Sequence, residues 1–320
     1  PQAAAEHLVQ AAAQGAACVW VRNAVDEAIA AVADLRGRGV AADLLHARFA
    51  LTDRKRHEAA VLAAFGKDRA ARPGRVLVAT QVVESSLDLD FDVMVSDLAP
   101  MAALIQRAGR LWRHMQERPA GDRPVPAPVL HVVSPEPGEA VAPDWAAAEL
   151  GQGVHVYPRD ALWRTARKLF AAGEIRAPEG LRDLIEAAHA DDPLPSALEA
   201  AALRAAGAAQ AQKAHGAQNV VGWDQGYRLG AGGAGDAEYP TRLGQPTRTL
   251  VLMRPDGAPW AGGGWSVDSC QLSEVSASKA RLDRLPLPAA PRPRPARLAD
   301  RDAQLRDGGR GWRNLSWPRL

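Results

Sequence analysis

The chain has 320 residues, enough for about two domains, and its 47% hydrophobic and 24% charged residues are the balance of an ordinary globular protein. A net charge of +2 is too small for the whole surface to attract nucleic acid, so such a site would be a local patch. The sequence shows neither an apolar run of membrane-spanning length nor cysteines in metal-binding spacing, since Cys18 and Cys270 lie far apart. We therefore expect a protein of the reducing cytoplasm with no membrane partner and no metal of its own.

The first 65 residues alternate between expected helices and expected strands. Residues 18–21 have the apolar content of a buried strand. Asn23 can cap the helix that follows, which would place Val25, Ile29 and Val32 on one side. The expected helices cover about residues 2–14, 24–37 and 52–65, and the expected strands cover residues 18–21 and 40–46.

Three further apolar runs, at residues 76–79, 93–95 and 128–133, indicate buried strands. Polar residues follow the first two runs directly, at Thr80–Gln81 and Ser96–Asp97. Because ligands of open α/β sheets bind beyond the carboxyl ends of the strands, we expect functional side chains at these positions. Strands that alternate with helices at this spacing predict an α/β fold, a parallel sheet covered by helices.

Residues 101–114 have the periodicity of one amphipathic helix. Gly109 has no side chain, so a partner can approach the helix closely there. Arg110 and Arg113 are three residues apart and would lie on the same face. Two neighbouring guanidiniums repel each other unless an anion lies between them, and phosphate is the natural candidate. The expected buried side carries Leu104, Ile105, Ala108 and Leu111, and the other side carries Gln106, Arg107, Arg110 and Arg113.

The runs ATQVVESSLDLDFD (79–92) and DLAPMAALIQRAGRLWRH (97–114) resemble motifs V and VI of superfamily 2 helicases. They are most similar to the CRISPR-associated helicase-nucleases of type I systems. The Gln-x-x-Gly-Arg-x-x-Arg pattern is moderately specific alone, and it becomes strong when motif V precedes it by roughly twenty residues. The resemblance implies that residues 1–135 form the second RecA-like domain of such a helicase, with residues 20–23 in the place of motif IV.

In this family ATP lies between two RecA-like domains, and the second domain supplies charge stabilisation. By the resemblance, Arg110 and Arg113 are arginine fingers that reach the γ-phosphate, Gln106 orders them, and Asp88 contacts the ribose. A positioned guanidinium neutralises the charge of the transition state and is worth about 10³ to 10⁵ in rate. The remaining implied residues are Glu84 and Gly109 beside the nucleotide, Gln81 with residues 84–86 between the two sites, and Thr80, Arg22, Asn23 and Arg48 on the DNA backbone.

The second half of the chain is less informative. We expect a proline-rich linker over residues 136–158, an accessory domain over residues 159–290, and a tail rich in proline and arginine over residues 291–320 that cannot bury much. Residues 162–165 and 241–244 resemble, more weakly, the accessory carboxyl-terminal region of the same family. The accessory region should be mostly helical with a few strands: helices at 159–172, 178–189 and 195–214, and strands at 247–253 and 272–276.

Two patterns imitate known sites without the required context. Asp26-Glu27 matches the magnesium-binding box of helicases, but those carboxylates must follow a buried strand, whereas here they favour the first turn of a helix. Gly230, Gly232 and Gly235 have the spacing of a dinucleotide-binding loop, yet no strand precedes them and no helix follows. The sequence also contains no complete phosphate loop and no paired His-Asp of the family's metal-dependent nuclease domain.

The resemblance therefore implies the carboxyl-terminal motor half of an ATP-dependent DNA helicase or translocase of CRISPR antiviral defence. ATP and Mg²⁺ would be bound by the complete enzyme, and we expect this chain alone to bind neither. The implied partners are single-stranded DNA, the first RecA-like domain, the nuclease domain and a Cascade-type effector complex. Two other interpretations stay open: another superfamily 2 DNA helicase, such as a repair helicase, or a non-catalytic nucleic-acid-binding or assembly module from a truncated or split helicase.

Without a phosphate loop and magnesium carboxylates, the 320-residue chain is predicted to have no meaningful ATPase activity, with or without DNA. The physical reason is that the nucleotide must be held before any arginine can stabilise phosphoryl transfer. Phosphate release by the purified chain, measured with and without single-stranded DNA, checks this prediction. Robust DNA-stimulated turnover would show that the chain holds ATP with residues of its own.

Overall fold

A computed structural model describes residues 1–67, 72–84, 87–139, 141–190, 193–218 and 247–285. The chain divides into two compact units, Pro1–Ala47 with Arg54–Ala205 and Arg48–Asp53 with Ala206–Leu320. None of the described helices is long and apolar enough to cross a membrane. The expected features that lie outside the described residues are the tail at 291–320, the run at 241–244, Gly230, Gly232 and Gly235, and residues 85–86.

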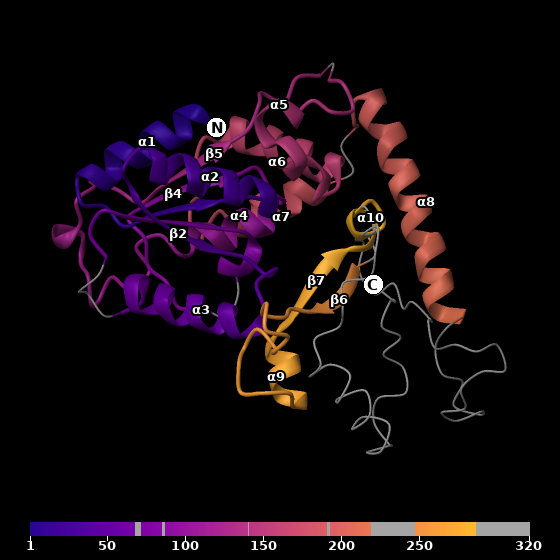
Figure 1. Ribbon diagram of the computed structural model, residues 1–320. Coiled ribbons are helices and arrows are strands. Elements are labelled where there is room, and N and C mark those ends of the chain that lie inside the picture. The colour runs from indigo at the N-terminus through magenta and orange to yellow at the C-terminus, as the bar shows by residue number, and fades with distance from the viewer. Residues whose placement is uncertain (68–71, 85–86, 140, 191–192, 219–246, 286–320) are drawn as a thin grey trace, which may run out of the picture. The chain divides into compact units, whose positions relative to one another are not determined.

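Among the described residues, five parallel strands form one sheet in the order β2-β3-β1-β4-β5 (Figure 1). Parallel neighbours cannot be joined by tight turns, so the chain crosses over the sheet between strands and covers it. This arrangement confirms the predicted α/β fold, a parallel sheet covered by helices. The strands are β1 (Cys18–Val21), β2 (Ala41–Leu45), β3 (Arg75–Ala79), β4 (Val93–Asp97) and β5 (Val129–Val133).

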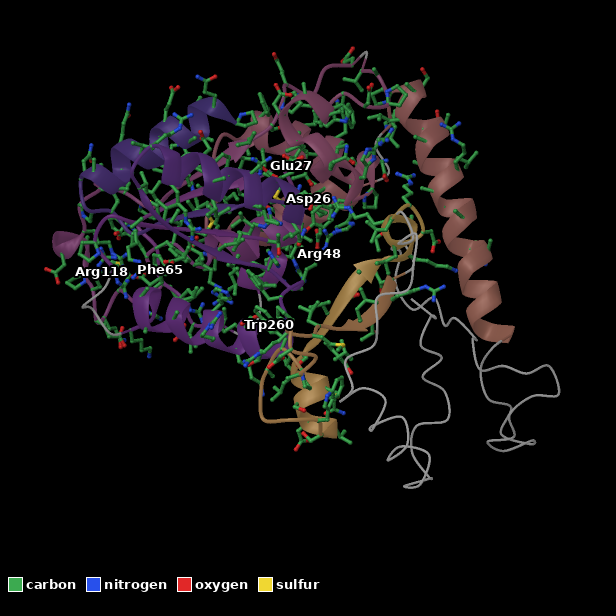
Figure 2. The ribbon with its side chains drawn as sticks, in the orientation of Figure 1. Asp26, Glu27, Arg48, Phe65, Arg118 and Trp260 are labelled. Carbon is green, nitrogen blue, oxygen red and sulfur yellow. The ribbon has the colours of Figure 1, made fainter. Side chains whose placement is uncertain are left out.

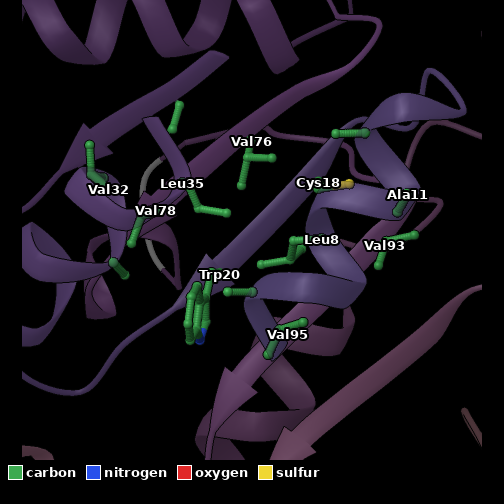
Figure 3. Close-up of a cluster of buried hydrophobic side chains, with 14 of the residues drawn as sticks. Leu8, Ala11, Cys18, Trp20, Val32, Leu35, Val76, Val78, Val93 and Val95 are labelled. Carbon is green, nitrogen blue, oxygen red and sulfur yellow. The ribbon is translucent and has the colours of Figure 1, made fainter. Parts of the chain in front are cut away.

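The two amino-terminal helices, α1 (Gln2–Ala13) and α2 (Val25–Gly37), cover one face of the sheet (Figure 1). Side chains of a strand alternate between the two faces, and Trp20 of β1 points to this one. There it lies in one buried cluster with Leu8 of α1 and Leu35 of α2 (Figure 3). Full burial of such an aliphatic side chain is worth about 1.5–3 kcal/mol. The neighbouring strands contribute Val76, Val78, Val93 and Val95.

The opposite face of the sheet packs against α3 (Leu51–Phe65) (Figure 1). Val19 and Val21, which alternate with Cys18 and Trp20 along β1, point to this face. Phe65 at the end of α3 lies against Phe91, with ring centroids 5.1 Å apart. Because both faces of the central strands are buried, these strands are apolar at nearly every position, and this is the pattern that made them recognisable in the sequence.

A third apolar cluster lies where the chain leaves β4. Leu98 and Leu104 pack there with Leu150 and Val154 from the expected linker, residues 136–158. This stretch therefore folds against the sheet instead of linking two separate parts, and the first compact unit continues to Ala205. The helices of the region are α4 (Met101–Ala108), η2 (Ala120–Asp122), α5 (Ala147–Leu150), η3 (Gly151–His155), α6 (Arg159–Ala172) and α7 (Leu181–His189).

In the second unit, β6 (Thr247–Val251) and β7 (Glu274–Ser278) pair antiparallel. The side chain of Ser266 accepts a hydrogen bond from the N–H of Ser269 and caps the helix before β7. These elements confirm the predicted accessory region of helices with a few strands. The helices are α8 (Ser196–Gln218), which begins in the first unit, α9 (Val267–Leu272) and α10 (Lys279–Leu282).

Two expected details of α2 are wrong. Asn23 does not cap the helix, because Ala24 holds the N-cap position and the Asn23 side chain donates to the carbonyl of Leu98 at 2.8 Å. Ile29 is 47% exposed and does not face the core. Alanines allow the helix to lie close to the sheet, so the face that is richest in alanine is buried in place of the one that carries Ile29. The buried residues are Ala28, Ala31, Val32 and Leu35.

The expected helix over residues 101–114 is too long, because α4 ends at Ala108. Beyond it the backbone pairs with Phe91: the Phe91 N–H donates to the carbonyl of Arg110, and its carbonyl accepts from the N–H of Trp112, each at 3.0 Å. Trp112 has a φ of 49°, which no continuing right-handed helix contains. Pairing with a distant part of the chain therefore outweighs the local preference for a helix.

A buried cluster of charges anchors the segment that follows this pairing. Asp90 and Asp92, just before β4, are fully buried and accept hydrogen bonds from Arg72, Arg118 and Arg123. Asp92 Oδ2 lies 2.6 Å from Arg118 Nη2, and Asp92 Oδ1 lies 3.1 Å from Arg123 Nη1. Figure 2 labels Arg118 at this end of the sheet. Charges taken out of water are stable only when paired, so these five side chains depend on one another.

Removal of one carboxylate from this cluster should be strongly destabilising. Asp92→Ala leaves buried arginines short of a counter-charge, and we expect the free energy of unfolding to fall by about 3–5 kcal/mol. The control is Asp34→Ala, which removes the exposed partner of Arg38 on α2 and should change that free energy by about 1 kcal/mol or less. Urea denaturation followed by circular dichroism measures both. Equal losses would show that the cluster contributes no more than a surface pair.

Candidate functional site

Polar residues at or just after the carboxyl ends of three strands meet at this edge of the sheet. Asn23 comes after β1, Gln81 comes after β3, and Asp97 ends β4. Gln81 Nε2 donates to the carbonyl of Asn23 at 2.9 Å, and Asp97 Oδ2 accepts from the N–H of Asn23 at 2.9 Å. The strand ends that were expected to carry functional side chains are thus bonded to one another.

Arg107 is the centre of this edge network. The sequence pattern placed it opposite the buried side of its helix, and this is wrong, because the Arg107 side chain is fully buried. Its guanidinium donates to Glu84 Oε1 at 2.8 Å, to Ser96 Oγ at 2.8 Å and to the hydroxyl of Tyr157 at 3.2 Å. These polar partners outweigh the apolar periodicity of α4. The other acceptors of Arg107 are the Asp97 carbonyl at 3.1 Å and Asn23 Oδ1 at 3.4 Å.

A second buried pair, Arg22 with Asp97, lies beside Arg107. Arg22 is 4% exposed, and its Nε is 3.1 Å from Asp97 Oδ2. The Arg22 guanidinium also lies over the Trp20 ring, 4.9 Å from its centroid, and donates to Glu27 at 3.4 Å. Burial raises the pKa of Asp97, although Arg22 acts in the opposite direction. Arg22 and Asn23, both predicted as DNA contacts, therefore have partners inside the protein.

The segment of α5 and η3, residues 147–155, covers this edge. Gly151 has a φ of 53°, and a Cβ there would collide with the carboxylate of Glu27. Glu27 instead accepts a hydrogen bond from the N–H of Gln152 at 3.1 Å. Asp26 and Glu27 lie in the first turn of α2, where the sequence placed them (Figure 2). Within the described residues, no group of three or more His, Cys, Asp or Glu side chains could hold a metal ion.

The arginine loop, residues 109–114, carries both predicted finger residues. Because α4 ends before this loop, Arg110 and Arg113 do not share a helix face as expected. Arg110 Nε donates to the carbonyl of Val83 and Arg110 Nη2 to the carbonyl of Glu84, each at 3.1 Å. Burial, and then the positive charge of Arg113, lower the pKa of Arg110. An anion beside these two guanidiniums would be stabilised by both.

Arg113 is bound to Asp88 in this loop. Arg113 Nε lies 2.6 Å from Asp88 Oδ1, and His114 Nε2 lies 3.0 Å from the same oxygen. The hydrogen bond from Arg113, followed by that from His114, lowers the pKa of Asp88 to about 2. Arg113 and Asp88 are 44% and 48% exposed, and with Lys67 they line a cavity of about 470 Å³. A ligand in solution can therefore reach both side chains.

The other predicted site residues lie in different surroundings. Gln106 and Gly109 are exposed at the end of α4. Thr80 is buried after β3, and Arg48 is exposed in the Arg48–Asp53 segment of the second unit. The structure thus joins Glu84 to Arg110 and Asp88 to Arg113. The roles assigned to these residues stay predictions.

Two members of the network were not among the predicted site residues. Arg107 had a readable signal, because the polar residues Glu84 and Ser96 near buried strands need a donor if they are to be buried. Tyr157 had none: it lies 50 residues from Arg107, in the stretch expected to be a linker. Its contact could not be inferred from local sequence.

Residues 14–116 match the family model described as CRISPR-associated nuclease/helicase Cas3, C-terminal. The CRISPR-associated endonuclease/helicase Cas3 of Escherichia coli (strain K12) is 35% identical over 193 residues, 58% of this chain and 20% of that protein. The chain is thus similar to the carboxyl-terminal half of the Cas3 helicase-nucleases. The resemblance predicted from residues 79–92 and 97–114 is thereby confirmed.

Solved Cas3 structures agree with this result. The crystal structure of T. fusca Cas3-ATP superposes with a TM-score of 0.65 at 27% identity, covering 87% of this chain and 34% of that chain. A chain of a CRISPR RNA-guided surveillance complex, pre-nicking, superposes with a TM-score of 0.61 at 27% identity, covering 88% of this chain and 35% of its own length. These neighbours confirm the RecA-like fold. The chain spans 20% of the E. coli Cas3 sequence and about a third of these solved chains.

Protonation of Asp88 should release Arg113. Because the folded pKa of about 2 lies below the ordinary value of 3.8, the pair stabilises the folded chain fully above about pH 4 and loses this contribution as the pH falls through 2. Arg113→Gln should raise the Asp88 pKa towards 3.8, and His114→Gln should raise it by less. Carboxyl-carbon NMR titration measures these values.

The control for this titration is Arg38→Gln, which removes an exposed guanidinium directly after α2 that pairs with Asp34 and should leave the Asp88 pKa at about 2. An Asp88 pKa that stays near 2 in Arg113→Gln would mean that the close contact between Arg113 and Asp88 is not what lowers it.

Proposed function

We propose that the chain is the carboxyl-terminal motor half of an ATP-dependent DNA helicase or translocase that acts in CRISPR antiviral defence in the cytoplasm. One relative is named an endonuclease/helicase and another is the Cas3-ATP structure, which supports ATP as the nucleotide. The observation that carries the proposal is the arginine loop. Arg113 lines a cavity there, and its positive charge, after burial, lowers the pKa of Arg110. A phosphate group would relieve this repulsion.

The arginine loop fits a role in charge stabilisation. Phosphoryl transfer spreads negative charge over the phosphate oxygens, and a guanidinium beside them stabilises the transition state. The carbonyl oxygens of Val83 and Glu84 hold Arg110 without neutralising it, so its charge stays available. Gln106 would order the fingers, and Gly109, which has no side chain, would allow a close approach.

Asp88 would exchange partners when a nucleotide binds. Without a ligand it neutralises Arg113 at 2.6 Å. A phosphate group would replace the carboxylate at Arg113, and the freed Asp88 would accept hydrogen bonds from the ribose hydroxyls. ATP and Mg²⁺ would be held together with the first RecA-like domain, which would supply the phosphate loop and the magnesium carboxylates.

The DNA side of the proposal rests on Arg48 of the second unit and, separately, on three residues at the carboxyl edge of the sheet in the first unit. Arg48 is exposed and suits a contact with the phosphate backbone. Thr80, Arg22 and Asn23 are buried in the described chain and bonded within it, so they would act by holding the edge in shape. Binding would then depend little on base sequence and would prefer single strands.

The remaining proposed partners come from the relatives. The pre-nicking surveillance complex supports association with a Cascade-type effector complex. The endonuclease/helicase name of the E. coli relative supports a nuclease domain as a further partner, and the relative is long enough to hold that domain as well, since the match covers 20% of it.

A second candidate function is a non-catalytic nucleic-acid-binding or assembly module. The observation in its favour is that both loop arginines already have partners in the chain, Arg110 with two carbonyls and Arg113 with Asp88. In that case the guanidiniums would serve the local structure or a DNA surface. The two functions differ in what the loss of each arginine does to hydrolysis.

The fingers are tested in an enzyme to which the first RecA-like domain has been restored, fused or in trans. Restoration should give DNA-stimulated hydrolysis, and Arg110→Ala or Arg113→Ala should then lower kcat by about a hundredfold or more. Lysine at either position should lower kcat nearly as much, because an ammonium group lacks the planar, two-pronged donor geometry of a guanidinium. DNA affinity without nucleotide should change little, because these substitutions remove an interaction that stabilises the transition state of ATP hydrolysis and not the complex with DNA.

Arg38→Ala, at an exposed position directly after α2, is the matched control and should leave kcat unchanged. Steady-state hydrolysis and DNA binding by fluorescence anisotropy are measured on the same preparations. If both finger variants keep hydrolysing ATP while DNA binding weakens, the arginines belong to a binding surface and the second candidate is correct.

A further inference from the structure

Tyr157 lies between η3 and α6, outside the helicase motifs, yet its hydroxyl reaches the centre of the edge network. The ring packs against the apolar cluster that contains Leu98 and Leu104. The hydroxyl accepts a hydrogen bond from Arg107 Nη2 at 3.2 Å, and the side chain of Gln81 also bonds to it. Burial raises the pKa of Tyr157, so the hydroxyl is neutral at physiological pH.

One partner of this hydroxyl, Gln81, begins the segment that binds the Arg110 side chain, and the other, Arg107, binds that segment through Glu84. Gln81 begins the short helix η1 (Gln81–Val83), and the carbonyls of Val83 and Glu84 accept the hydrogen bonds from Arg110. Arg107, on α4, binds the carboxylate of Glu84 from the other side. A shift of the hydroxyl would therefore move the oxygens that position Arg110.

The backbone before Tyr157 is held against the start of α2 and against Asn23, which follows β1. Glu27 holds the N–H of Gln152, and a Cβ at Gly153 would lie 3.1 Å from Cβ of Asn23. A displacement of Asn23 towards Gly153 would thus press on the segment that carries Tyr157. Asn23 is one of the proposed DNA-side residues.

We propose that Tyr157 is a positioning residue that couples DNA binding to the placement of Arg110, because its hydroxyl ties Gln81 to Arg107. The inference rests on the proposed function, and it assigns a role in the motor cycle to a residue of the stretch 136–158, outside the helicase motifs. Phenylalanine would fill the same space but could not accept from Arg107.

A purely structural role for the hydroxyl predicts a different outcome. Arg107 has a charged partner in Glu84 at 2.7 Å and further acceptors in Ser96 and Asp97, so it stays paired without Tyr157. Tyr157→Phe should therefore fold normally. The variant should lose only the link between Gln81 of η1 and Arg107 of α4 that passes through the Tyr157 hydroxyl.

The first test uses the 320-residue chain and needs no activity. In Tyr157→Phe, hydrogen exchange of the Val83 and Glu84 amides, which bond within and just after η1, should become about threefold faster or more. Amides of β1 should keep their rates. Thr165→Val is the control, because it removes another buried hydroxyl, on α6, and should leave the η1 amides unchanged. Unchanged exchange at η1 in Tyr157→Phe overturns the proposal.

The second test uses the enzyme restored with the first RecA-like domain. Tyr157→Phe should lower the DNA stimulation of kcat by about threefold or more, with KM for ATP and Tm close to those of the parent. Gln81→Met removes the other end of the same bond, and the double variant should lose no more than Gln81→Met alone. Full stimulation in Tyr157→Phe, or additive losses in the double variant, would overturn the coupling role.

These tests separate the proposal from the function on which it rests. If Arg110→Ala abolishes hydrolysis while Tyr157→Phe keeps full DNA stimulation, the motor function stands and the coupling role of Tyr157 is wrong. If the restored enzyme does not hydrolyse ATP, the proposed function fails and the coupling role fails with it. The exchange rates still decide whether the hydroxyl holds η1.

Discussion

The burial of one guanidinium, that of Arg107, is the interaction on which the carboxyl edge of the sheet depends. A buried cation must be neutralised and its N–H groups must find acceptors, because an unpaired charge in the interior costs several kcal/mol. This requirement fixes where Glu84 and Ser96 lie, and with them the position of η1 relative to α4 and β4. Glu84 then offers its carbonyl to Arg110, so the burial of one arginine orients a second.

The strands could be predicted from the sequence because a parallel sheet buries both faces of its central strands, and their apolar runs are continuous. Helix limits were harder to predict where tertiary pairing decides them. The helical pattern continues past Ala108, but the backbone of Arg110 and Trp112 pairs with Phe91, a contact between segments that no local pattern reveals. The exposure of Ile29 was also not predicted. The buried face of α2 is rich in alanine, and alanine indicates a buried face only weakly in a hydrophobic pattern.

The segments of the candidate site could be located from the sequence, but the contacts between their side chains could not be predicted. Motif spacing identified Arg110, Arg113 and Asp88, which lie in neighbouring segments, and the structure joins two of them directly. Arg107 was assigned to the wrong side of its helix, because periodicity counts apolar residues and ignores a polar network that can bury a charge. Tyr157 could not be found at all, since its position depends on how residues 136–158 fold back onto the sheet.

The pairing of Phe91 with the arginine loop has a mechanical consequence. The loop leaves α4, pairs with Phe91 just before β4 and continues into the segment whose arginines bind Asp90 and Asp92. It is therefore part of the frame of the domain and has little freedom to fold or unfold alone. Arg110 and Arg113 would therefore move together with the whole domain. The rate at which they reach a ligand would be set by domain motion and not by the ordering of a flexible loop.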